Sequence, residues 1–382
     1  MKLFFAGDFC SKPSTSKIIV SDELKNVIQS CDLKVVNFEV PLKPDVKLPP
    51  QGRERFFQND DAPDFLRGLG FNLFSLANNH AFDWDEEGFK KTKAALGSAS
   101  FGAGTYEEAY RPKIVEVDGK KIGFLGLSFA AYKGIFDNVT KHDGLGCAYI
   151  NDLKVNHIIM EAKKEIDYLF IMAHDGIEYI DVPLPETIAR YRDLIDYGAD
   201  GIIAAHPHCP QGWEVYKGKP IFYSLGNFLF NSKENYDFRA NKPHWYEGLV
   251  VVMTIENGNI SYEVKNTCNV DNVRIEIDHN ESRMRHNERI CRYLSVDDEY
   301  WHYFKKVSKI HGYDKFLITI DTTIHPQNLK LCTKIIANYW VRKLFRKPVQ
   351  GNDLALERIF KHDTNRQLFM WSLRQHQVSN KK

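Results

Sequence analysis

Short apolar runs alternate with longer stretches of helical period along the first two-thirds of the chain. The runs are rich in Val, Ile, Leu and Phe, as in strands that are buried on both faces of a sheet. This alternation predicts an α/β domain. Its strands are expected at 2–6, 33–37, 73–77, 121–127, 168–173, 201–205, 220–224 and 249–255.

Helical periodicity and turn residues mark the connections between these strands. The helices are expected at 22–30, 87–96, 156–164 and 185–197, and Gly198 follows the last of them as a helix stop. Asp118 and Gly119 stand between two apolar stretches, and an Asp-Gly pair suits a type I′ hairpin turn.

The composition changes after about residue 270, where longer charged and aromatic stretches replace the strand pattern. We therefore expect two parts, residues 1–270 and a mostly helical part at 271–382. The segment 329–347 carries apolar side chains at helical spacing and basic side chains elsewhere on the turn. Packing of its apolar stripe on the core is the favoured interpretation. Peripheral contact with a membrane is the alternative.

Charge and cysteine content narrow the classes of partner. The 51 Lys and Arg residues and 50 Asp and Glu residues leave a net charge of +1, so no overall field draws the chain to nucleic acid. No segment approaches the roughly 20 apolar residues of a membrane span, and the apolar start meets Asp8 too early for a signal peptide. Seven scattered cysteines without a CxxC pair argue against a disulfide framework. We expect a cytoplasmic protein.

Polar side chains recur where the predicted strands end. They are Asp8, Asn37 with Glu39, Asn79 with His80, His174, and His206 with His208. A single histidine at a strand end is usually a hydrogen-bonded structural group. Several such sites together favour a shared function, because open α/β sheets bind ligands at the carboxyl ends of their strands. Carboxylate, amide and imidazole groups hold Mn, Fe or Zn, so the set predicts a catalytic metal centre.

A pair of metals would need a shared ligand. Two ions about 3.5 to 4 Å apart require a bridging carboxylate, and Glu39 is the natural bridge. Pro207 restricts the backbone between His206 and His208. We expect this to aim the two imidazoles in different directions, so that each reaches a different metal.

Six motifs occur in one order along the first 255 residues. They are Gly7-Asp8, NFEVP at 37–41, ANNHAFD at 77–83, HDGIE at 174–178, HPH at 206–208 and SLGNF at 224–228. In this order the chain resembles the CapA family of capsule and poly-gamma-glutamate biosynthesis proteins, which is related to the calcineurin-like metallophosphoesterases. The resemblance implies a four-layer αββα sandwich of the metallophosphoesterase type at 1–270.

The resemblance also implies a set of ligands and catalytic residues. One metal would be held by Asp8, Glu39 and His208, and the other by Glu39, Asn79, His174 and His206. Asp8 and His80 would be catalytic, with His80 as general acid near the leaving group. The implied cofactors are two divalent ions, Mn, Fe or Zn.

Further polar residues stand beside these ligands. Glu178, Gln211 and Asn227 are predicted to contact substrate, and Asp83 and Glu214 belong to the same group of supporting residues. A role in turns or caps is an equal alternative for each. Two positions depart from the relatives: Cys10 replaces the histidine of calcineurin-like enzymes, and Asp175 replaces a tryptophan common in the CapA family.

Two functions from different classes remain open. The first is a metal-dependent hydrolase in capsule, exopolysaccharide or poly-gamma-glutamate biosynthesis, which acts on a cell-surface polymer precursor or a phosphoester. The second is a non-catalytic accessory protein that works with capsule or exopolysaccharide biosynthesis proteins. The complete donor set and His80 favour the enzyme, whereas Cys10 favours the accessory protein.

Overall fold

The computed structural model describes residues 1–12, 17–48, 55–130, 134–136, 144–231, 242, 244–309, 367–368 and 371. The chain forms two compact units, Met1–Val296 and Asp297–Lys382. The boundary predicted at residue 270 falls inside the first unit, before the strand β18 (Arg274–Ile277) and the helix α8 (Glu281–Ser295). The amphipathic helix predicted at 329–347 lies outside the described residues.

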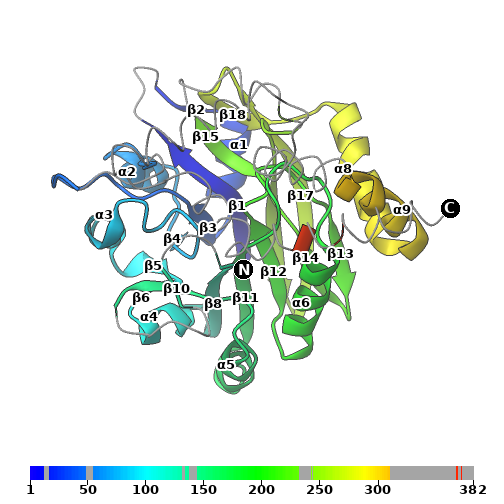
Figure 1. The fold of residues 1–382 in the computed structure, drawn as a ribbon, viewed down its shortest axis with the longest axis horizontal. Coiled ribbons are helices and arrows are strands. Elements are labelled where there is room, and N and C mark those ends of the chain that lie inside the picture. The colour runs from blue at the N-terminus through cyan, green and yellow to red at the C-terminus, as the bar shows by residue number, and fades with distance from the viewer. Residues whose placement is uncertain are drawn as a thin grey trace, which may run out of the picture. The chain divides into compact units, whose positions relative to one another are not determined.

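One sheet of the first unit is built around its first strand (Figure 1). Its order is β2-β18-β17-β16-β1-β3-β4-β5, and β15 also pairs with β1. The strands are β1 (Lys2–Ser11), β2 (Ile19–Val20), β3 (Leu33–Phe38), β4 (Leu73–Ser75), β5 (Ser100–Phe101), β15 (Asn227–Asn231), β16 (Glu247–Glu256) and β17 (Asn259–Val270), together with β18. β1, β3, β4 and β5 run parallel, whereas β16 is antiparallel to β1.

The second sheet has the order β13-β14-β12-β11-β8-β7. Its strands are β7 (Lys113–Val117), β8 (Lys120–Ser128), β11 (Tyr168–His174), β12 (Gly201–Ala205), β13 (Trp213–Tyr216) and β14 (Lys219–Phe222). β8, β11, β12 and β14 are parallel. The predicted hairpin turn between β7 and β8 is confirmed, because Asp118 and Gly119 have φ values of 52° and 71°.

The remaining elements connect or cover these sheets. A small sheet joins β6 (Ala103–Gly104), β10 (Gly146–Ala148) and β9 (Ile135–Phe136). The helices of the first unit include α1 (Asp22–Gln29), α2 (Ala62–Gly68), α3 (Asp85–Leu96), the 3-10 helix η1 (Gly97–Ala99), α4 (Tyr106–Tyr110), α5 (Lys154–Ala162), α6 (Pro185–Asp196) and α8. α4 begins at a capping box, in which Thr105 and Glu108 bond each other's backbone N–H groups.

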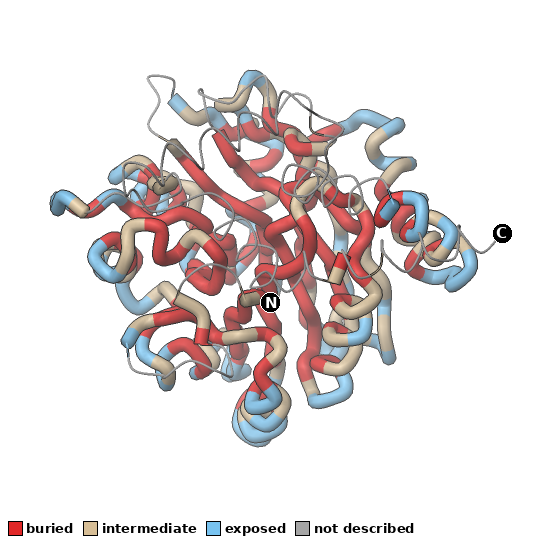
Figure 2. The backbone as a smooth tube through the Cα atoms, in the orientation of Figure 1, coloured by how far each residue is buried: buried red, intermediate tan, exposed pale blue. Residues whose placement is uncertain are grey.

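Alternate residues of β1 face two different cores. Leu3 and Phe5 pack with apolar residues of the second sheet, whereas Phe4 and Ala6 pack with residues of α1, α2 and α3. On the outer side of the second sheet, α6 packs on β12 and β14. The central strands β1, β3, β11 and β12 are mostly buried, and the exposed backbone lies toward the outside of the molecule (Figure 2). The four-layer αββα arrangement predicted from the sequence is therefore confirmed.

The predicted strands and helices are all present, but the sequence analysis did not predict several further elements, among them α2, β13, β15 and β17. β17 alternates polar and apolar residues, such as Ser261, Tyr262, Glu263 and Val264, and it pairs with β16 from Asn259 to Cys268. Its alternating pattern lacks the continuous apolar run that marks a strand buried on both faces. In the described part of the chain, no helix has the length and apolar character needed to cross a membrane.

The second unit contains α9 (Asp297–Ser308). Along this helix Tyr300 stacks on Phe304, with ring centroids 5.7 Å apart. The ring of Trp371 lies 5.1 Å from that of Trp301. An aromatic cluster therefore joins two segments of this unit that are distant in sequence.

Candidate metal centre

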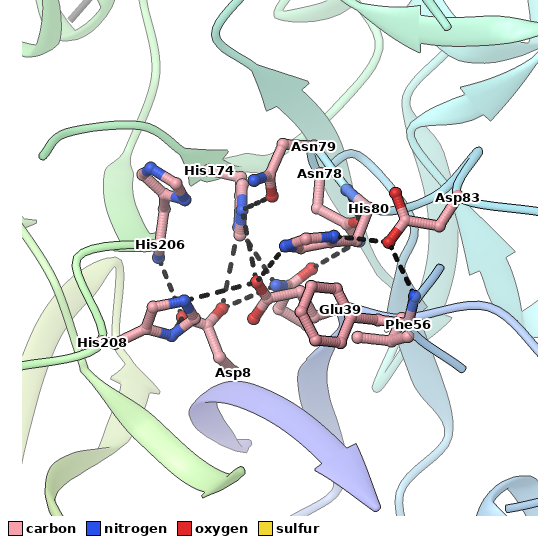
Figure 3. A network of polar contacts seen from close by, with 12 residues as sticks. Asp8, Glu39, Phe56, Asn78, Asn79, His80, Asp83, His174, His206 and His208 are labelled. Atoms are coloured by element: carbon pink, nitrogen blue, oxygen red, sulfur yellow. Dashed lines mark hydrogen bonds and ion pairs between the residues drawn. The ribbon is translucent and has the colours of Figure 1, made fainter. Parts of the chain in front are cut away.

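The strand-end residues predicted to form a site meet between the two sheets. Asp8 lies in β1, Glu39 directly follows β3, and His174 ends β11. His206 directly follows β12. Because the carboxyl ends of the parallel strands of both sheets face the same region, polar groups from four strands converge there (Figure 3).

A glycine contact sets the position of Asp8. The backbone N–H of Asp8 donates to the carbonyl oxygen of Gly226 at 3.0 Å. A Cβ atom on Gly7 would overlap this same oxygen, so only glycine allows β1 to approach the loop before β15 so closely. The pairing of β1 with β3 shifts register at this point, between Ala6 and Asp8.

Asp8, Glu39 and His208 form the tightest group of potential ligands. One ligand atom from each lies within 4.8 Å of the others, and all three residues are buried. His208 Nδ1 is 3.4 Å from Asp8 Oδ2, and His208 Nε2 is 3.7 Å from Glu39 Oε1. This is the set that the resemblance to the CapA family implies for the first metal.

Asn227 sets the orientation of His208. Its Oδ1 lies 2.9 Å from His208 Nδ1, and its amide nitrogen donates to the carbonyl oxygen of Trp245 at 2.9 Å. An Nδ1–H that donates to Asn227 leaves the lone pair of Nε2 directed at Glu39. Asn227, for which the sequence analysis predicts a contact with substrate, thus orients His208.

His174 and Asn79 approach Glu39 from the other side. His174 Nε2 lies 2.8 Å from Asn79 Oδ1 and 4.0 Å from Glu39 Oε1. Asn37 connects the two halves of the group, because its amide nitrogen is 2.6 Å from Asp8 Oδ1 and 3.1 Å from His174 Nδ1. The strand pattern pointed to Asn37, yet its role as a link only appears in the structure.

His206 contributes its backbone to the centre. Its N–H donates to Asp8 Oδ2 at 2.9 Å. Its imidazole lies against Phe129, with ring centroids 4.5 Å apart, and points away from Glu39 in Figure 3. The φ values of His206 and His208 are 103° and 56°, a strained backbone of the kind that collects at functional sites.

His80 forms a pair with a carboxylate. Its Nδ1 lies 2.8 Å from Asp83 Oδ2, and its Nε2 is 4.0 Å from Glu39 Oε1. Asp83 also accepts the N–H of Phe56 at 3.2 Å, and the Phe56 ring packs edge-on against the imidazole. The side chain of His80 is 11% exposed, whereas that of Glu39 is fully buried. His80 is therefore closer to solvent than the other side chains around Glu39 Oε1.

Burial sets the charges of the centre. It raises the pKa of Glu39 well above its usual range, and the negative charges of Asp8 and Glu178 raise it further. Burial opposes ionisation of Asp8 too, but hydrogen bonds with His208 and Asn37 hold the Asp8 pKa below its ordinary value. Burial lowers the pKa of His174 to about 3, so this imidazole is neutral and available as a ligand.

The donor set fits divalent metal ions. Neither oxygen of the buried Glu39 carboxylate accepts a hydrogen bond from the residues that the structure describes. A buried carboxylate left in this way is costly unless a cation or proton compensates it. Carboxylate oxygens, an amide oxygen and neutral imidazoles are the donors that Mn, Fe and Zn accept.

Three further predicted residues have other partners. Gln211 donates from its amide to the carbonyl oxygens of Ile180 and Val182, at 2.7 and 3.4 Å. Glu214 binds Arg192 through both carboxylate oxygens, at 2.9 and 2.7 Å. Asp175 accepts from the hydroxyl of Thr187 at 3.2 Å. These contacts shape the loops around the centre.

Cys10 and Asn78 complete the surroundings. Cys10 is buried in an apolar cluster with Val40, Phe230 and Trp245. Asn78 donates to the carbonyl oxygen of Phe38 at 3.0 Å and to Asn37 Oδ1 at 3.3 Å. The sequence analysis missed Asn78, although it stands in the same motif as Asn79 and His80.

The chain is similar to proteins of capsule synthesis. It is 31% identical to the PGA biosynthesis protein CapA of Bacillus subtilis (strain 168) over 211 residues, which are 54% of this chain and 55% of that protein. Identity to the capsule biosynthesis protein CapA of Bacillus anthracis is also 31%, over 56% of this chain and 53% of that one. The chain thus spans about half the length of the curated relatives it matches.

Two other similarities are weaker. A probable polyglutamine synthesis accessory protein of Mycobacterium tuberculosis is 26% identical over 52% of this chain and 55% of that protein. The solved structure of a sulfate thiohydrolase, SoxB, from Thermus thermophilus covers 69% of this chain and 56% of that one, with a TM-score of 0.40 and 11% identity.

A family profile decides the classification. The profile described as bacterial capsule synthesis protein PGA_cap matches residues 2–232. This range contains every motif on which the predicted resemblance to CapA rests. The chain therefore belongs to the PGA_cap family of bacterial capsule synthesis proteins.

Proposed function

We propose that the chain is a metal-dependent hydrolase of the phosphoesterase type, which acts in capsule, exopolysaccharide or poly-gamma-glutamate biosynthesis through a dinuclear centre. The supporting observation is the fully buried Glu39 carboxylate. Three imidazole nitrogens, from His80, His174 and His208, lie 3.7 to 4.0 Å from its Oε1. A bridging carboxylate between two ions needs this kind of surrounding.

The proposal assigns the ligands to two positions. Asp8, Glu39 and His208 would hold one ion, and Glu39, Asn79, His174 and His206 the other. His206 would join by turning its ring from Phe129 toward His174, whose ring centroid is 4.8 Å away. Bound divalent ions would polarise a phosphoryl or acyl oxygen and acidify the attacking water.

His80 would supply the proton for the leaving group. Asp83 accepts from Nδ1, so Nε2 faces the centre. Phe56 fixes the ring by edge-on contact at 5.2 Å. The partial exposure of His80 allows it to exchange protons with solvent, which a general acid needs in each turnover.

Metal analysis tests the proposal. Protein is purified without chelator, supplied with Mn, Fe or Zn, and compared with Glu39→Gln, which keeps the size of the side chain and removes its charge. Glu263→Gln on the exposed face of β17 is the matched control. We expect Glu39→Gln to lose two equivalents of metal relative to the wild type, and the control to lose none.

A second candidate is a non-catalytic accessory protein. Cys10 favours it, because this thiol lies in an apolar cluster where calcineurin-like enzymes have a ligand histidine. The name of the mycobacterial relative points in the same direction. Equal metal content in the wild type and Glu39→Gln, with no hydrolysis of aryl phosphomonoesters, phosphodiesters or gamma-glutamyl amides, would select this function.

A further inference from the structure

We propose that the first unit has a separate metal site, formed by Asp181, His244 and His286. Asp181 lies in the loop between β11 and α6, His244 in the turn before β16, and His286 on α8. One potential ligand atom from each lies within 4.8 Å of the others. No residue of this group belongs to the centre around Glu39.

The distances within the group are short. His286 Nε2 is 3.1 Å from Asp181 Oδ2. The rings of His244 and His286 stack at 15° with centroids 4.2 Å apart. Two imidazoles this close repel each other when both are protonated. A cation shared by neutral rings and the Asp181 carboxylate would remove this repulsion.

Glu247 supports His244 as a metal ligand. Its Oε2 lies 2.8 Å from His244 Nδ1, and its Oε1 is 3.4 Å from the Nε of Arg283. A histidine that binds a metal typically donates its other ring N–H to a carboxylate, which fixes the tautomer and the direction of the ring. With Nδ1–H donating to Glu247, the lone pair on Nε2 of His244 is left for the ion.

The donor set indicates the kind of ion. Two imidazoles and one carboxylate, with a water in the remaining position, match a three-ligand zinc site. Side-chain exposures of 13% for Asp181, 24% for His244 and 12% for His286 leave an entry path for the ion. The Nη2 of Arg289 lies 2.7 Å from His286 Nδ1. When Nε2 of His286 binds a metal, Nδ1 carries the proton and no longer accepts a hydrogen bond, so the contact with Arg289 has to break.

The site would stabilise the segment that positions His208. Trp245 follows His244 directly, and its ring centroid lies 4.8 Å from that of His208. The carbonyl oxygen of Trp245 accepts from Asn227, whose Oδ1 orients His208. An ion bound to His244 and to α8 therefore holds one wall of the centre. Its role is structural, because none of its ligands touches the Glu39 group.

The test measures zinc binding to the full chain after chelator treatment. The variants are His286→Ala, Asp181→Asn, which keeps size and hydrogen bonding, and Glu247→Gln. His279→Ala is the matched control, since His279 is an exposed histidine just before α8 that pairs with Glu23 at the surface. Glu39→Gln tests whether the zinc is bound at the centre around Glu39 instead. Bound zinc is counted by elemental analysis after desalting, and melting temperatures are recorded with and without zinc.

We expect His286→Ala and Asp181→Asn to lose one equivalent of zinc and the zinc-dependent rise in melting temperature. Glu247→Gln should weaken this binding by roughly 10- to 100-fold, as removal of a supporting carboxylate does. The equivalent of zinc at the proposed site should remain bound in Glu39→Gln and in His279→Ala. Unchanged stoichiometry in both His286→Ala and Asp181→Asn would overturn the proposal. If Glu39→Gln lost the same equivalent of zinc, that zinc would belong to the buried centre around Glu39. This result would also overturn the proposal.

Discussion

Replacement of Gly7 by alanine tests how the fold positions Asp8. The new Cβ would overlap the carbonyl oxygen of Gly226, and it would lie 3.0 Å from the carbonyl carbon and 3.2 Å from the Cβ of Leu225. The nearest of these atoms are backbone, so they cannot move aside as the end of a side chain can. Either β1 or the loop before β15 has to shift.

The cost has two parts. Overpacking in a well-packed core costs about 1–3 kcal/mol. The shift also weakens the buried hydrogen bond from Asp8 to Gly226, which contributes about 0.5–1.5 kcal/mol at its 3.0 Å length. The free energy of unfolding should therefore fall by about 2–4 kcal/mol. With an m value of about 3 kcal/mol/M, the urea midpoint drops by about 1 M.

Urea unfolding followed by circular dichroism measures the change. Gly68→Ala is the matched control, because a Cβ there meets no atom within 4 Å and the residue ends α2. Metal binding is measured in parallel, since a displaced Asp8 should weaken it. A Gly7→Ala protein with the urea midpoint and metal affinity of the wild type would refute the argument from close packing.

Three further outcomes are expected. His80→Asn should lower turnover by about 10²- to 10⁴-fold while metal content stays constant; equal losses of metal and turnover would contradict a general acid. Asp200 accepts from Lys163 and Lys219 at 2.6 Å and from a backbone N–H at 2.9 Å. Asp200→Ala should therefore lower the free energy of unfolding, measured in urea, by about 1–3 kcal/mol, and Asp200→Asn should lower it less. Burial raises the pKa of Cys147 to about 12, so its alkylation by iodoacetamide at pH 8 should require unfolding, and rapid labelling of the native protein would contradict this.

Much of the fold follows from local pattern. Strands such as Leu73–Ser75 and Gly201–Ala205 are buried throughout, so the apolar run itself marks them. The strand β17 lacks this mark, because it is half exposed and depends on pairing with β16. Its place in the sheet is a long-range property, which a local pattern does not contain.

The candidate metal centre also depends partly on local sequence pattern and partly on tertiary structure. The sequence alone determined that Glu39, His174 and His206 stand at strand ends, and the carboxyl ends of parallel strands lie along one edge of their sheet. Only the tertiary structure decided which atoms face each other, because side-chain direction depends on neighbours from other strands. Glu214 thus turns to Arg192.

The group of Asp181, His244 and His286 depends entirely on tertiary structure. Its members come from two loops and a helix, with long stretches of chain between them. No spacing or periodicity in the sequence marks them as a set. The packing of α8 and the turn before β16 near the loop after β11 brings them together, and only folding creates that proximity.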